Sequence, residues 1–445
     1  MAYTPHTDDD VRRALTTIGV DDVQALFASV PAELRDPSLS LAEPMDEVRL
    51  LDHLRDLADA DASRGPNFLG GGVRRHFIPA VTRHLTFQSE FVTAYTPYQA
   101  EVSQGMLQAT FEYQTIMSEL TGLPVSNASM YDGASAVAEA ALLAMRTTRR
   151  ERVVASRGVH PETRQVLATY LDALGATLDV VDLDGLATPV PADLADAACL
   201  IVQNPNHLGR IENLEPFAEA AHAAGALLVA AVDPISLPLL QAPGEAGADV
   251  AAGDGQTLGV PAQYGGPHFG FLVVGERLIR QLPGRLVGQT SDVDGRRGFV
   301  LTLQAREQHI RRAKAKSNIC SNHQLTALMA TVNVAALGPQ GLREVATGTV
   351  RNAHALADRL EREGFDVVRD GPFFAEFPLR VARDPNDLRR DLHRAGVRAG
   401  VPVPVEYGLG PAVLLAATEL TRPDEVDALV AALHAVGAGR AEAVR

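Results

Sequence analysis

The segment Ala226-Leu-Leu-Val-Ala-Ala-Val-Asp233 decides the fold, because it is apolar along its length and ends on a carboxylate. A strand that is apolar on both faces is typical of a parallel sheet covered by helices. Similar runs occur at Arg152–Ala155, Ala198–Val202 and Phe269–Val274, with helical stretches between them. This alternation predicts a large α/β domain with a mostly parallel sheet. Ligands of such sheets bind at the carboxyl ends of the strands, which is where Asp233 lies.

The pattern changes on both sides of this domain. Apolar residues at helical spacing from Asp8 to Leu26 and from Met45 to Leu57 predict a helical arm at the start of the chain. After about Gly338, a long helix, a strand pair and two further helices predict a smaller α+β domain. The expected division of the chain is an arm over residues 1–80, a large domain over 81–338 and a small domain over 339–445.

Composition excludes several classes of protein. The formal net charge of −15 argues against nucleic-acid binding, which requires clustered Lys and Arg. The two cysteines, Cys199 and Cys320, are too few for a disulfide framework or a Cys-built zinc site, and the histidines lack metal-ligand spacing. No apolar run approaches the length needed to span a bilayer. We therefore expect a cytoplasmic protein without a metal, a membrane or a nucleic-acid partner.

Two features of the sequence match parts of a pyridoxal phosphate site. Such a site needs an Asp that keeps the pyridine nitrogen protonated, a Lys for the Schiff base and helix-start amides for the phosphate. Asp233 fits the first part, and Asp132-Gly-Ala-Ser135 at the start of a helix fits the third. Each also has an ordinary interpretation, since Asp233 precedes a Pro as turn residues do, and Asp132 is a common type of helix cap.

The lysine is missing from its expected place. Lys314 and Lys316 are the only lysines in the chain, and both belong to the basic run that follows Arg311 and Arg312. Where a Lys-Thr pair would be expected after Asp233, the sequence has Gln256-Thr257, and a neutral amide cannot form a Schiff base. A basic run of this kind is most often a solvated face.

A series of short motifs runs along nearly the whole length of the chain. The motifs are Tyr95-Thr-Pro-Tyr-Gln99, Phe111-Glu-Tyr-Gln114, Asn127-Ala-Ser-Met-Tyr-Asp-Gly133, Gln203-Asn-Pro-Asn206, Gly253-Asp-Gly-Gln256, Tyr264-Gly-Gly-Pro267, Arg306-Glu-Gln-His-Ile-Arg-Arg312, Ser317-Asn-Ile-Cys320 and Gly371-Pro-Phe-Phe374. In this combination, which is very specific, the chain resembles a known family, the glycine dehydrogenase P-proteins, and is similar to the alpha half of that enzyme.

The resemblance implies the fold and the function. The expected fold is that of the fold type I, aminotransferase-like pyridoxal-dependent transferases, with a sheet of the seven-stranded type. In the family, two homologous halves form an alternating assembly, which some organisms encode as two subunits of a heterotetramer. The resemblance implies that the second subunit carries pyridoxal 5′-phosphate on its Lys, while this chain, with Gln256 at that position, completes the enzyme. Glycine is decarboxylated, CO2 is released, and the aminomethyl group passes to the lipoyl arm of the H-protein.

The turn Tyr95-Thr-Pro-Tyr-Gln99 is the candidate contribution of this chain to catalysis. A Pro-stiffened turn with two phenols can orient a small substrate that carries a carboxylate, although it could also be an inter-subunit packing loop. The resemblance favours the joint active site, and we take Tyr95, Tyr98, Gln99 and Tyr113 as candidate catalytic residues. Tyr113 lies on the following helix, where core packing is nearly as good an explanation.

Two departures and two alternatives accompany this interpretation. The family usually has a Tyr near Arg74, and it commonly has an aromatic ring where this chain has His207. One alternative is a scaffold or regulatory pseudoenzyme in the same complex. The other is a free-standing pyridoxal enzyme that uses Lys314, although Lys314 does not follow a strand end after Asp233.

Overall fold

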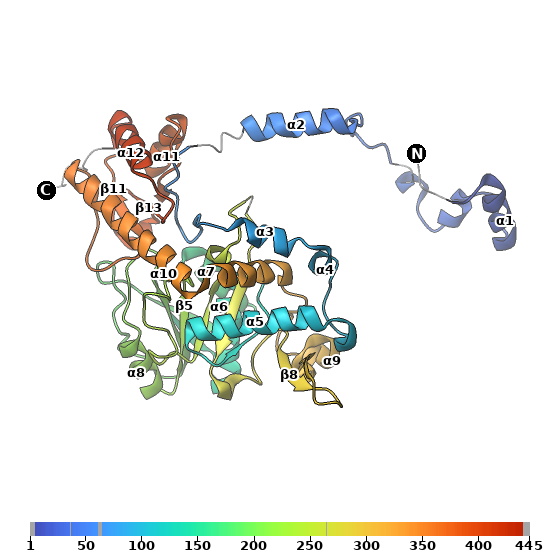
Figure 1. The fold of residues 1–445 in the computed structure, drawn as a ribbon, viewed down its shortest axis with the longest axis horizontal. Helices are drawn as coiled ribbons and strands as arrows, with labels where there is room; N and C mark the ends of the chain where they lie inside the picture. The colour runs from blue at the N-terminus through green and yellow to red at the C-terminus, as the bar shows by residue number, and fades with distance from the viewer. Residues whose placement is uncertain (1–4, 36, 61–64, 264, 439–445) are drawn as a thin grey trace. The chain divides into compact units, whose positions relative to one another are not determined.

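The computed structural model describes residues 5–35, 37–60, 65–263 and 265–438. The chain forms two compact units, Met1–Ser63 and Arg64–Arg445 (Figure 1). The boundary between the units therefore lies earlier than residue 80, where the sequence predicts the end of the arm, because the segment after residue 64 belongs to the larger unit. There Phe68 is fully buried in a core of the C-terminal region, and its N–H donates to the Arg398 carbonyl at 2.7 Å.

The first unit contains the two helices that the apolar spacing predicts, α1 (Asp8–Ile18) and α2 (Glu47–Ala60), and two short 3-10 helices, η1 (Gln24–Phe27) and η2 (Ala32–Leu34). A capping box between Thr7 and Asp10 begins α1, because each side chain accepts from the backbone of the other residue. Neither α1 nor α2 has a buried residue. The leucines of α2 are therefore exposed.

The larger unit is built on a seven-stranded sheet with the order β1-β7-β6-β5-β4-β2-β3. Five neighbouring strands, from β3 to β6, pair in parallel, whereas β7 and β1 pair antiparallel at one side. This confirms the predicted mostly parallel sheet. The strands are β1 (Val125–Ser126), β2 (Arg152–Ser156), β3 (Thr177–Val181), β4 (Ala197–Asn204), β5 (Leu227–Val232), β6 (Val250–Asp254) and β7 (Gly270–Val274).

Helices cover both faces of this sheet. Along β4, Leu200 and Val202 pack with residues of α5, α8 and α10, whereas Cys199 and Ile201 pack with residues of α6 and α7. Every residue of β5 is buried, as its apolar sequence predicts. The helices of this region are α3 (Ala80–Thr86), α4 (Ser89–Val92), α5 (Gln104–Thr121), α6 (Gly133–Thr148), α7 (Pro161–Asp172), α8 (Glu215–Ala223) and α9 (Gln308–Arg311).

The C-terminal part contains a second, antiparallel sheet with the order β10-β11-β13-β12. The helix α10 (Gln324–Arg362) leads into it and is interrupted at Gly338, whose φ of 65° lies outside the helical region, just before Pro339. A two-stranded sheet, β8 (Val287–Ser291) with β9 (Arg297–Leu301), precedes α10. The C-terminal elements are β10 (Asp366–Val367), β11 (Glu376–Arg380), α11 (Pro385–Arg394), β12 (Val401–Pro402), β13 (Ala412–Ala416) and α12 (Pro423–Ala435).

Among the described helices, α10 is long and apolar enough to cross a membrane by length and composition, contrary to the expectation from the sequence. Half of its most apolar window is buried inside the protein. Buried core helices meet the same criteria, and Ala327, Leu328 and Ala330 of α10 are almost fully buried. We therefore assign no membrane segment to α10.

Candidate functional site

A cavity of about 320 Å³ lies at the carboxyl ends of β5 and β6, at the sheet edge where the sequence predicts a ligand site. Residues of the seven-stranded sheet and of the four-stranded sheet line it, and so do residues of the loop before α3. The lining residues on which its chemistry depends are Arg74, Asp132, Asp233, Asp254, Thr257 and Glu376.

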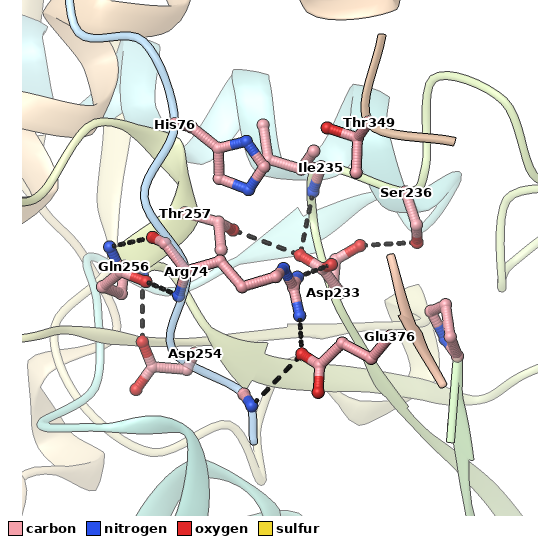
Figure 2. A network of polar contacts seen from close by, with 12 residues as sticks. Arg74, His76, Asp233, Ile235, Ser236, Asp254, Gln256, Thr257, Thr349 and Glu376 are labelled. Carbon is pink, nitrogen blue, oxygen red and sulfur yellow. Dashed lines mark hydrogen bonds and ion pairs between the residues drawn. The ribbon is translucent and has the colours of Figure 1, made fainter. Parts of the chain in front are cut away.

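Arg74 occupies the position opposite Asp233 (Figure 2). Its guanidinium forms an ion pair with Asp233 and a second one, at 2.6 Å, with Glu376 of β11. Thr257 Oγ1 also donates to Asp233, at 3.1 Å. Burial alone would lower the pKa of Arg74, but the charges of Asp233 and Glu376 outweigh this effect and raise it. The carboxylate expected to face a pyridine nitrogen is therefore paired with a permanent cation of the same chain.

Gln256, which stands in place of the lysine, is buried, and its amide forms hydrogen bonds that hold the loop carrying Arg74. Its Oε1 accepts from the Arg74 backbone N–H at 3.1 Å, and its Nε2 donates to the Arg74 carbonyl at 2.9 Å. A further bond from Nε2 reaches the Val260 carbonyl at 2.8 Å. The amide side chain thus fixes the backbone of the residue that fills the site.

The helix start that would hold a phosphate is already occupied by carboxylates. Asp132 caps α6, since the Ser135 N–H donates to its Oδ1 at 2.7 Å. The Gly133 N–H donates to Asp254 Oδ2 at 3.2 Å. Burial raises the pKa of Asp254, and the negative charge of Asp132 acts in the same direction. Two acidic groups at these amides would repel a phosphate, which an open helix start would attract.

Pyridoxal phosphate therefore does not fit this chain. Each of its three anchoring points, the nitrogen partner, the lysine and the phosphate amides, is missing or filled by another side chain. Lys314 and Lys316 do not replace the missing lysine, because neither lines the cavity, and Lys314 is exposed. Of the described residues, no group of three or more His, Cys, Asp and Glu side chains is arranged to hold a metal ion.

His207 forms part of the cavity wall within a cluster of rings. Its ring lies edge-on to His160 at 4.8 Å between centroids and 5.6 Å from the ring of Tyr407. Burial, together with the nearby charges of His160 and Arg164, lowers the pKa of His207 to about 3. His207 is therefore neutral near pH 7 and serves as a packed ring, as an aromatic residue would.

The predicted catalytic turn lies on the surface, before α5. Tyr95 is 73% exposed and Tyr98 is 50% exposed, and Gln99 is exposed as well. Ser321 Oγ donates to the Tyr95 phenol oxygen at 2.9 Å, and Thr96 Oγ1 in turn donates to Ser321 at 3.1 Å. The structure thus brings Tyr95, Tyr98 and Gln99 together on one exposed turn.

The buried side chain of Arg285 contacts the phenol of Tyr98. Its Nη2 donates to the Tyr98 hydroxyl at 2.7 Å, and the guanidinium carbon lies 4.9 Å from the centroid of the Tyr98 ring. The same guanidinium forms a buried ion pair with Glu307, and it lies 3.4 Å from Cys320 Sγ. Burial raises the pKa of Glu307, an effect that the charges of Arg285 and Arg306 oppose.

Tyr113 is buried in the core, unlike Tyr95, Tyr98 and Gln99. It is 2% exposed, packs edge-on against Phe269 at 5.9 Å and has no hydrogen-bond partner for its hydroxyl among the described residues. Burial raises the pKa of the Tyr113 phenol. A group enclosed in the core does not reach a substrate, so the structure favours packing over the catalytic role predicted for Tyr113.

Several residues around the cavity, and several that contact Tyr98 or its partner Arg285, were not predicted from the sequence. Arg74 attracted notice only as a departure from the family pattern, Glu307 only as part of the motif Arg306–Arg312, and Glu376 and Arg285 carried no signal of their own. Arg74, Asp233 and Glu376 meet because three segments far apart in the sequence converge in the fold. The buried pair of Arg285 and Glu307 likewise has no sequence pattern that would identify it.

Comparison with known proteins identifies the family. The family model of the glycine cleavage system P-protein matches residues 1–433. Among curated relatives, the probable glycine dehydrogenase (decarboxylating) subunit 1 of Moorella thermoacetica is 48% identical over 443 residues, covering 98% of this chain and all of the relative. The protein of the same name from Exiguobacterium sibiricum is 46% identical over 438 residues, covering 97% of this chain and 98% of the relative.

Solved structures agree with this result. A crystal structure of glycine decarboxylase (P-protein) of the glycine cleavage system, in inhibitor-bound form, matches with a TM-score of 0.92 and 54% identity over 98% of this chain and all of that chain. The cysteine desulfurase of Thermococcus onnurineus NA1 matches with a TM-score of 0.63 at 14% identity, over 89% of this chain and 99% of that chain. This second likeness shows the fold alone, and it agrees with the predicted aminotransferase-like α/β architecture.

Proposed function

The chain belongs to the glycine cleavage system P-protein family, and on this premise we propose that it is the subunit of a two-chain glycine-decarboxylating enzyme that does not carry the cofactor. The observation that carries this proposal is the filled strand-edge site. Gln256 stands at the position of the lysine, and Arg74 neutralises Asp233. A chain with this arrangement needs a second subunit to supply the Schiff-base lysine.

In the proposed reaction, glycine is bound and decarboxylated on pyridoxal phosphate held by the second subunit. CO2 leaves, and the aminomethyl group passes to one sulfur of the lipoyl disulfide of the H-protein. The disulfide is reduced in this step, which makes the enzyme an oxidoreductase that acts on the CH–NH2 group of glycine. This chain is active only together with the second subunit.

We further propose that Tyr95, Tyr98 and Gln99 complete the partner's active site. They form an exposed polar turn, and both phenol oxygens accept a hydrogen bond from inside the chain. Each phenol can therefore donate its own proton outward, to an anionic group such as the carboxylate of glycine. Tyr113, on the helix α5 that follows this turn, contributes only by packing in the core.

The test is the replacement of Tyr95 and Tyr98 by Phe, one at a time, in the reconstituted two-subunit enzyme. Removing a hydroxyl that binds a charged group should lower kcat/KM by roughly tenfold or more, since such a bond contributes about 1.5–3 kcal/mol. Co-elution of the two subunits and the melting temperature should not change. Tyr131→Phe is a control for the loss of a phenol elsewhere in the same chain.

The competing proposal is that this chain only scaffolds or regulates the catalytic subunit. The exposure of both phenols would then reflect packing against the partner. Unchanged turnover in both Phe variants, with weakened co-elution, would favour the scaffold. Lowered turnover with intact assembly would exclude it.

A further inference from the structure

Arg285 is the buried group on which the geometry of Tyr98 depends. Its side chain is 3% exposed and that of its ion-pair partner Glu307 is 2% exposed, so the pair lies within the protein while Tyr98 reaches the surface. The pair with Glu307 fixes one side of the guanidinium. The opposite nitrogen, Nη2, donates to the Tyr98 oxygen at 2.7 Å.

The hydrogen bond from Arg285 determines in which direction the Tyr98 hydroxyl can donate its proton. A guanidinium is always protonated and has no acceptor, so the Tyr98 oxygen must accept from Arg285. The proton of the Tyr98 hydroxyl must then point to some other acceptor. The edge-on ring of His309, at 5.9 Å, and the guanidinium beneath the ring leave the phenol little freedom to rotate away.

We propose that Arg285 is a positioning residue that makes Tyr98 a fixed hydrogen-bond donor toward the carboxylate of the amino-acid substrate in the partner's site. This inference rests on the proposed function, which gives Tyr98 its substrate. It adds that the donor is set in place before the substrate arrives. Pre-organised donors lower the barrier because they need not reorient during the reaction.

A double-mutant cycle in the reconstituted two-subunit enzyme tests this coupling. The variants are Tyr98→Phe, Arg285→Gln combined with Glu307→Gln, and all three changes together. Removing both charges of the buried pair avoids leaving one of them unpaired. The readouts are kcat and KM for glycine, with co-elution of the subunits as the test of assembly.

If Arg285 acts through Tyr98, the paired Gln variant should lower kcat/KM by roughly tenfold in the chain with Tyr98, and it should cause no further loss in the Tyr98→Phe background. Arg306→Gln is the matched control. Arg306 is a neighbouring arginine that donates to the carbonyls of Leu282 and Gly284 and does not contact Tyr98. Its effect should add to that of Tyr98→Phe.

The outcomes separate the two proposals. If Tyr98→Phe leaves kcat/KM unchanged, the role proposed for Tyr98 fails, and this inference fails with it. If Tyr98→Phe lowers kcat/KM but the Arg285 effect is absent or additive, only the positioning role is overturned. Should the paired Gln variant not assemble, the same cycle with Arg285→Lys, which keeps the charge, decides by the same criterion of non-additivity.

Discussion

Arg74 forms an ion pair with Asp233, the carboxylate that the sequence predicts will face the pyridine nitrogen of pyridoxal phosphate in a cofactor-binding chain. It links Asp233, at the end of β5, to Glu376 of β11, so one side chain joins the seven-stranded sheet to the four-stranded sheet. The Gln256 amide fixes the backbone of Arg74 on both its N–H and its carbonyl. The polar residues at this strand edge are therefore held by contacts within the chain.

This leads to a prediction for stability. Arg74→Ala should lower the free energy of unfolding by about 3 kcal/mol, because it leaves the buried Glu376 and the partly buried Asp233 without their cation. Denaturant unfolding measures the effect. Arg75→Ala changes the adjacent, exposed arginine and should have almost none. An equal effect of the two changes would show that Arg74 is not the link between the sheets.

His207 leads to a prediction for pH dependence. Its pKa in the folded state, about 3, lies below the value of about 6.5 in the unfolded chain, so protons bind preferentially to the unfolded chain as the pH falls below 6.5. The stability associated with neutral His207 is present near pH 7 and is lost progressively toward pH 3. His207→Phe should therefore reduce the stability loss between pH 7 and pH 5 by about 2 kcal/mol.

The control for this prediction is His393→Phe, which changes an exposed histidine of α11. It should leave the pH dependence of unfolding as it is in the unchanged protein. A His207→Phe variant that loses as much stability on acidification as the unchanged protein would contradict the role of His207 as a neutral packed ring.

Sequence predicted some of these residues and not others, for a physical reason. Asp233, Asp132 and Gln256 were found because each stands at a fixed place relative to a strand or a helix start. Arg74, Glu376 and Arg285 act through contacts between segments that lie far apart in the chain, and no local pattern encodes such contacts. Burial also could not be determined from the sequence for Tyr113, since its helical position fits either a core or a surface residue.

At the scale of elements, apolar periodicity predicted β2, β4, β5 and β7 and the helices α1, α2 and α6. It did not identify β1, β3 or β6. The two residues of β1 are too few to show a pattern, and β3 is only partly buried, so its alternation is weak. The beginning of α10 before Gly338 was also not predicted, because Gly338 and Pro339 are residues that normally end a helix.

The helix α2 leads to a prediction about assembly. Leu50, Leu54 and Leu57 recur at helical spacing and are all exposed, so no described residue of the first unit covers this apolar stripe. We expect the second subunit to cover it. Deleting residues 1–60 should leave the larger unit folded and weaken binding of the second subunit by at least about tenfold, or 1.4 kcal/mol.

A matched pair of variants separates the stripe from the rest of the arm. Replacing the three leucines by Ser should weaken binding nearly as much as the deletion does. Replacing Arg49, His53 and Asp56 of the same helix by Ser should have a much smaller effect. Unchanged affinity after the deletion, measured by titration of one subunit with the other, would refute a role of the arm in assembly.

At the scale of the whole molecule, the chain retains the architecture of a pyridoxal enzyme but not its cofactor site. The fold built on its seven-stranded sheet matches that of the glycine decarboxylase (P-protein) structure with a TM-score of 0.92. The cofactor-anchoring positions taken by other side chains and the exposed turn at Tyr95–Gln99 support the proposed division of labour, in which one subunit holds the cofactor and the other completes the site. This division is the central claim of the proposed function.

Borohydride trapping in the reconstituted two-subunit enzyme tests this claim most directly. Reduction converts a Schiff base into a stable amine on the lysine that formed it, and peptide mass spectrometry then identifies that lysine. We predict that the second subunit is labelled, that this chain is not, and that changing both Lys314 and Lys316 to Arg leaves the bound chromophore intact. A pyridoxyl-modified peptide of this chain containing Lys314 or Lys316, or loss of the chromophore in the double Arg variant, would contradict the division of labour.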